Sequence, residues 1–96
     1  MTDKLRQAAE RGRQAEALLS NPLFVEAFDT VERSLHETWA ETKGDQAMIR
    51  EDAWRSLRLL AHIRTAIGKH VRTGKLAKDE IEQLARAEKP RRFLRP

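Results

Sequence analysis

The sequence predicts an all-α protein: a long antiparallel helical hairpin with a shorter N-terminal helix, a short C-terminal helix and a basic tail. Apolar residues recur at steps of three and four along most of the chain, which is the period of an α-helix. The charge is sorted by segment, since residues 22–42 carry five acids and one base, whereas residues 46–73 carry two acids and six bases. Consecutive helices of opposite charge favour packing against each other. We therefore expect these two segments to form the hairpin.

Length and composition limit what the protein is. We expect one helical domain over residues 1–88, followed by a basic tail over residues 89–96. A chain of 96 residues buries a modest fraction of its surface, so a homo-oligomer or a larger assembly is expected. The absence of cysteine excludes disulfides and thiolate catalysis. No apolar run approaches the roughly 20 residues of a membrane span, so a soluble protein without a membrane partner is expected.

The first predicted helix covers residues 2–19 and has a narrow face of mainly small residues. That face consists of Leu5, Ala8, Gly12, Ala15 and Leu19. Small residues permit close approach of another helix but bury little apolar area. We expect this helix either to dock on the hairpin or to become ordered on a partner.

The second predicted helix begins at the sequence Asn21-Pro22. Asparagine is a favoured N-cap, and proline is favoured at the first helical position, where its missing N–H costs nothing. One face of this helix is apolar and the opposite face is acidic. The apolar face consists of Phe24, Ala27, Phe28, Val31, Leu35 and Trp39.

The third predicted helix runs from residue 46 to about residue 73, after a short link. In that link we expect Gly44 to adopt the left-handed conformation that ends a helix, and Asp45 to cap the next one. The main apolar stripe of the third helix consists of Ile49, Ala53, Leu57, Leu60, Ile63, Ile67 and Val71. A second apolar strip, with Met48, Leu59 and Ala66, indicates that this helix contacts more than one neighbour.

A fourth, short helix is predicted after Gly74, which resembles a C-terminal stop, and it should end before Pro90. The positive charge of the chain is concentrated after it. Residues 1–85 hold fourteen bases and fourteen acids, whereas residues 86–96 hold five bases and one acid. A basic tail of this kind favours an acidic protein surface or DNA.

Two sets of residues are candidates for partner binding. A basic face of the third helix, together with the tail, is the candidate surface for nucleic acid or an acidic partner: Arg50, Arg58, Arg64, Lys69, Arg72, Lys89, Arg91, Arg92 and Arg95. The alternative for the helix face is neutralisation by the acidic second helix. The candidate contacts with a protein partner are Met48, Trp54, Leu59, Phe93 and Leu94. Trp54 has an alternative role too, which is packing against an arginine within the fold.

No residue pattern indicates catalysis. The sequence has no phosphate-binding glycine loop and no nucleophile motif, so we expect a non-enzymatic protein without a cofactor. Glu32 and His36 are four residues apart, with Asp29 one turn before them. No second histidine or cysteine joins this group, so no metal site is predicted.

Several short segments resemble small helical proteins from the structural and packaging gene blocks of tailed bacteriophages and prophages. The similar segments are Asn21-Pro22-Leu23-Phe24 with Ala27-Phe28, then Trp39 and Thr42, Arg50-Glu51 with Trp54, and Gly74-Lys75-Leu76-Ala77. The resemblance covers roughly residues 15–77 and leaves the tail outside.

This resemblance implies a structural or assembly component of the phage head, portal or packaging apparatus, located in the virion or the host cytoplasm. Its partners would be other phage structural proteins or further copies of itself. One alternative is a DNA-binding protein of the packaging machinery, which would use the basic face and tail. Another is a small adaptor or inhibitor of a host protein, which a defined complex with one partner would reveal.

Overall fold

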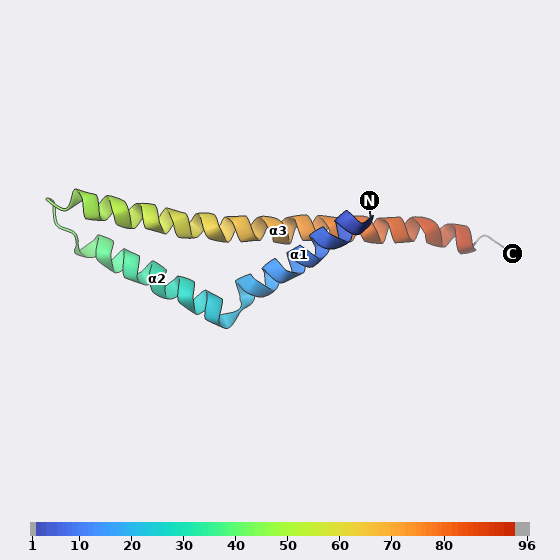
Figure 1. Ribbon diagram of the computed structural model, residues 1–96, viewed down its shortest axis with the longest axis horizontal. Coiled ribbons are helices and arrows are strands. Elements are labelled where there is room, and N and C mark those ends of the chain that lie inside the picture. Colours follow the sequence, from blue (N-terminus) through green and yellow to red (C-terminus); the bar gives the residue numbers. More distant parts are fainter. Residues whose placement is uncertain (1, 94–96) are drawn as a thin grey trace. The chain divides into compact units, whose positions relative to one another are not determined.

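The computed structural model describes the backbone of residues 2–93 and the side chains of residues 2–87. This part of the chain forms three helices and no strand: α1 (Thr2–Ser20), α2 (Pro22–Glu41) and α3 (Ala47–Phe93) (Figure 1). The predicted all-α class is therefore confirmed. Leu94 and Arg95 of the predicted tail lie outside the described residues, as do the side chains of Lys89, Arg91, Arg92 and Phe93.

The helices form two compact units. Unit 1 comprises Met1–Ala17 and Gly68–Pro96, which are most of α1 and the second part of α3. Unit 2 comprises Leu18–Ile67, which includes all of α2 and the first part of α3.

The start of α2 is as predicted. Asn21 is the N-cap, with φ −64° and ψ 124°. Its Oδ1 atom accepts hydrogen bonds from the backbone N–H groups of Leu23, at 2.9 Å, and Phe24, at 3.1 Å. These bonds satisfy two of the free donors at the helix start.

The link between α2 and α3 is closed differently from the prediction. No described glycine has a positive φ, so Gly44 does not end α2 in the left-handed conformation. Thr42 ends α2 instead, in an extended conformation, and its hydroxyl donates to the Trp39 carbonyl at 2.7 Å. On the other side of the link, α3 begins at Ala47, so Asp45 does not stand at its N-cap position, and the Gln46 Oε1 atom accepts from the Lys43 N–H at 2.9 Å. Because side chains satisfy these backbone groups, the link needs no left-handed residue.

The predicted stop at Gly74 and the separate C-terminal helix are wrong, because α3 continues through Gly74 to Phe93. The missing side chain of Gly74 serves packing. A Cβ atom added there would lie 2.6 Å from the Gly12 Cα atom. The predicted end before Pro90 is also wrong, since Pro90 lies inside the bounds of α3.

Unit 1 is held together by the crossing of α1 and α3 at Gly12 and Gly74. A Cβ atom added at Gly12 would lie 2.7 Å from both the Gly74 Cα atom and the His70 carbonyl oxygen. Ala15 and Ala77 are buried as well, at 7% and 5% exposure. The small-residue face of the first helix therefore docks on its own chain, which the sequence had left open.

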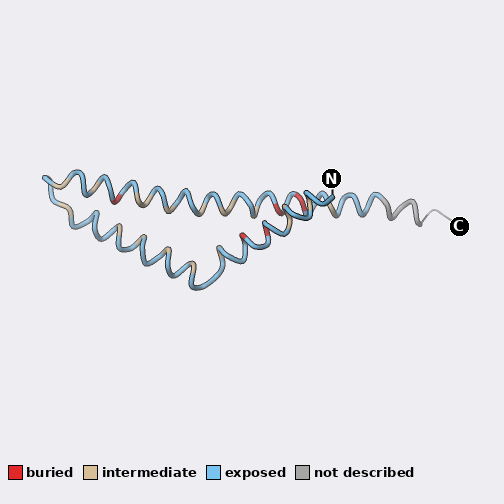
Figure 2. Tube along the Cα trace, in the orientation of Figure 1, coloured by how far each residue is buried: buried red, intermediate tan, exposed pale blue. Residues whose placement is uncertain are grey.

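Unit 2 pairs the face of α2 that carries Phe24, Phe28 and Leu35 with the first part of α3. These three side chains are half-buried, and on α3 Ala53 is buried at 4% exposure. The Phe24 and Phe28 rings are 4.5 Å apart between centroids. Figure 2 shows how few of the described positions are buried at all. Unit 2 therefore leaves much of its apolar surface in contact with solvent.

Candidate interaction surfaces

The predicted basic face of α3 is divided by the fold, since Arg50 and Arg64 make contacts within unit 2. The Arg50 guanidinium donates to the Lys43 carbonyl at 2.6 Å and to the Thr42 hydroxyl at 3.4 Å. These bonds brace the link between α2 and α3. Arg50 is thus engaged at the end of α2 rather than fully free for a phosphate.

Arg64 connects α3 to the acidic face of α2. Its guanidinium lies 3.2 Å from Glu32 and 3.5 Å from Asp29. It also lies over the Phe28 ring, 4.9 Å from the centroid. For this residue the structure supports neutralisation by the second helix, which was one of the two interpretations of the basic face.

Arg58 and Trp54 form a stacked pair on the surface of α3. The Arg58 guanidinium carbon lies 5.0 Å from the Trp54 ring centroid, within the range of a cation–π interaction. Trp54 nevertheless stays 50% exposed. The arginine contact expected within the fold is present, and the partner contact of Trp54 remains a prediction.

The second apolar strip of α3 lies open to solvent. Met48 is 78% exposed and Leu59 is 62% exposed. Ile63, assigned to the main stripe from the sequence, is 41% exposed. On a helix, Leu59 and Ile63 are neighbours four residues apart. We call Met48, Leu59 and Ile63 the apolar strip of unit 2.

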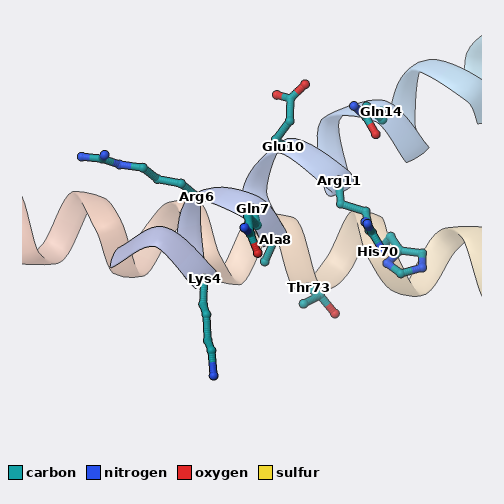
Figure 3. A pocket seen from close by; sticks show the side chains of 9 residues that line it. All are labelled: Lys4, Arg6, Gln7, Ala8, Glu10, Arg11, Gln14, His70 and Thr73. Atoms are coloured by element: carbon teal, nitrogen blue, oxygen red, sulfur yellow. The ribbon is translucent and has the colours of Figure 1, made fainter. Parts of the chain in front are cut away.

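Lys69 and Arg72 belong to unit 1. An open groove with a volume of about 880 Å³ runs along α1 and α3 in this unit. Figure 3 shows its side chains, which come from both helices. The residues that line it are Lys4, Arg6, Gln7, Ala8, Glu10, Arg11, Gln14, His70 and Thr73. We call this the basic groove.

The one acid in the basic groove is already paired. Glu10 accepts two hydrogen bonds from the Arg13 guanidinium, at 2.6 and 2.9 Å. These bonds lower the pKa of the Glu10 carboxyl and raise the pKa of Arg13. Glu10 therefore remains ionised, with an arginine outside the groove lining as its partner.

Neither a metal site nor a membrane span emerges from the described residues. Within them, no three His, Asp or Glu side chains gather where they could hold a metal ion. The described helices also lack any stretch that is both long enough and apolar enough to cross a lipid bilayer.

Comparison with known proteins gives no further constraint: no family model, no curated protein and no solved structure matches this chain.

Proposed function

We propose that this chain is a non-enzymatic assembly component, present in several copies, of a phage particle or of its head, portal or packaging apparatus. The observation that carries the proposal is the exposure of its large apolar side chains. Among the described residues no large side chain is fully buried, and the buried hydrophobic residues are Ala15, Ala53 and Ala77. An apolar surface exposed to this extent is typical of a site that contacts another protein.

The rigid element of such a subunit would be an antiparallel hairpin of α2 and the first part of α3. Two sets of contacts support this arrangement. Near the end of α2, Arg50 bonds to Thr42 and Lys43. Further along α3, Arg64 pairs with Asp29 and Glu32, which lie earlier on α2. Residue numbers that rise on one helix and fall on the other are typical of antiparallel neighbours.

The apolar strip of unit 2 is the surface that we assign to the neighbouring subunit. Leu59 lies on α3 between Leu57 and Leu60, which are half-buried, whereas Leu59 itself is mostly exposed. Replacing Leu59 therefore removes a surface contact and leaves the packing within unit 2 in place. This separation makes the proposal testable by a single substitution.

The test is the mass of the protein in solution, measured by sedimentation equilibrium for the wild type and for Leu59→Glu. We expect the wild type to be oligomeric. The dissociation constant of the variant should be at least tenfold higher, with unchanged circular dichroism. Leu76→Glu is the matched control, because Leu76 is 70% exposed but belongs to unit 1. A wild type that stays monomeric at high concentration would contradict self-assembly.

The phage setting rests on the resemblance of the segments around Asn21, Trp39 and Trp54, and it needs its own test. Particles and assembly intermediates induced from the strain that encodes the chain should contain it in several copies. Quantitative mass spectrometry measures that copy number. A defined one-to-one complex with a host protein, without incorporation into particles, would favour the adaptor or inhibitor instead.

A further inference from the structure

The net positive charge of the chain is confined to unit 1. Its residues, 1–17 and 68–96, contain thirteen Lys and Arg against seven Asp and Glu, a net charge of +6, of which residues 86–96 supply +4. Unit 2, residues 18–67, contains six against eight, a net charge of −2. Together these values give the +4 of the whole chain. Long-range attraction of a polyanion would therefore act on unit 1.

Within unit 1, α1 supplies three cationic side chains to the lining of the basic groove, and Figure 3 shows that Lys4 and Arg6 extend away from each other. Lys4, Arg6 and Arg11 all line it, and His70 and Thr73 line it from α3 (Figure 3). In the described part of the chain, Lys4, Arg6 and Arg11 have no ion-pair partner. Their charges are thus available to a ligand, unlike that of Arg64.

The one negative charge in the groove lining is paired with an arginine. Glu10, its one acid, is held by two hydrogen bonds to Arg13. Gln7 and Gln14 add neutral amide donors to the lining. A second, smaller groove of about 180 Å³ in the same unit is lined by Lys75 and Lys78, among others. Cationic side chains therefore lie along both grooves of the α1–α3 crossing.

The type of nucleic acid follows from the aromatic residues. Proteins that hold single strands stack the bases on aromatic side chains. The described side chains of unit 1 include no Phe or Trp, and the chain has no Tyr. An open groove with cations and no stacking platform suits the regular phosphate backbone of a duplex, without readout of the bases.

We propose that unit 1 binds the phosphate backbone of double-stranded DNA through the basic groove, with Lys4, Arg6 and Arg11 as its principal contacts. The binding is independent of base sequence. This assignment moves the DNA contact away from Arg50 and Arg64, which are engaged within unit 2, and onto α1. It stands apart from the assembly proposal, which concerns unit 2.

The experiment is the affinity of the full-length chain for a mixed-sequence DNA duplex, measured by fluorescence anisotropy over a series of salt concentrations. The test variant is Lys4→Gln/Arg6→Gln/Arg11→Gln. The matched control is Arg33→Gln/Arg55→Gln/Arg58→Gln, which removes the same charge from unit 2. Glutamine preserves helix propensity, and circular dichroism checks that each variant keeps its helices.

We expect the slope of log affinity against log salt to fall by about 2 to 3 in the test variant, since each phosphate contact contributes about 0.9. The control should change the slope by less than about 1. Equal loss in both variants would reduce the effect to net charge and overturn the proposal. Tighter binding of a single strand than of the duplex, or no binding by the wild type at low salt, would overturn it too.

A second variant covers the case in which the test variant loses its helices. Arg6→Lys/Arg11→Lys keeps both charges and should retain the wild-type slope if phosphate contacts set the affinity. If this variant is folded yet its slope falls as far as that expected for the glutamine test variant, the groove is not the binding site. The same measurement is made with an acidic polypeptide in place of DNA. Tighter binding of the polypeptide than of the duplex would indicate a protein partner and contradict the proposal.

Discussion

At the scale of single residues, the packing of unit 1 depends on two hydrogen atoms. Gly12 and Gly74 bring the backbones of α1 and α3 so close that neither position has room for a methyl group. The atoms in the way are backbone atoms, the Cα atoms of the glycines and the carbonyl oxygen of His70, which cannot rotate aside. A substitution here must move a helix.

Gly12→Ala is therefore expected to destabilise unit 1 by about 1 to 3 kcal/mol, the usual cost of overpacking. Gly68→Ala is the matched control, because Gly68 lies in α3 with nothing within 4 Å of its added Cβ atom. That control should gain up to about 1 kcal/mol from helix propensity. Thermal unfolding followed by circular dichroism compares the two. Equal behaviour of the two variants would contradict the close crossing.

These residues also show what the sequence can predict. Asn21 was predicted correctly as a cap because its effect is local: the donors that it satisfies lie two and three residues ahead. Gly74 was predicted wrongly because a glycine suits a helix end and a close helix crossing equally well. Only the position of Gly12, far away in the sequence, distinguishes the two roles.

The candidate surfaces follow the same rule. The exposed strip with Met48 and Leu59 was predicted, since helical period alone assigns residues to a face of their own helix. The basic groove was missed because Lys4, Arg6 and Arg11 lie among acids in the sequence and meet His70 only through the fold. Likewise, whether Arg64 is free or paired depends on which face α2 presents to it.

At the scale of elements, α2 and the first part of α3 are joined through one multiply engaged arginine. Arg64 contacts two carboxylates and an aromatic face at once. Each surface ion pair contributes about 0.2 to 1 kcal/mol, and a partly exposed cation–π contact about 0.5 to 1 kcal/mol. Arg64 also lies over the ring of Phe28, which is half-buried.

Replacement of Arg64 by alanine should thus destabilise unit 2 by about 1 to 2 kcal/mol, with the ionic part diminishing at high salt. Arg55→Ala is the comparison, because Arg55 pairs only with Glu51 on its own helix, at 2.9 Å. Its loss should stay within about 0.5 kcal/mol. Urea unfolding at low and high salt measures both. An Arg64 variant as stable as the Arg55 variant would show that α2 is held by apolar contacts alone.

At the scale of the whole molecule, the two units differ in the kind of partner that they suit. Unit 2 is acidic and exposes the apolar strip with Met48, Leu59 and Ile63. Unit 1 is basic and exposes cations along a groove. If unit 2 joins copies of the chain and unit 1 holds duplex DNA, as we propose, the two units together would suit a packaging apparatus, in which subunits and DNA meet.

If the apolar strip joins identical chains, the stability of the protein depends on its concentration. A partner that binds the folded chain but not the unfolded one raises the unfolding free energy by mass action. Over a hundredfold range of protein concentration this amounts to about 2.7 kcal/mol per dimer. The unfolding temperature of the wild type should therefore rise with concentration, whereas that of Leu59→Glu should not. A wild-type unfolding temperature that is constant over this range would contradict self-association through the apolar strip.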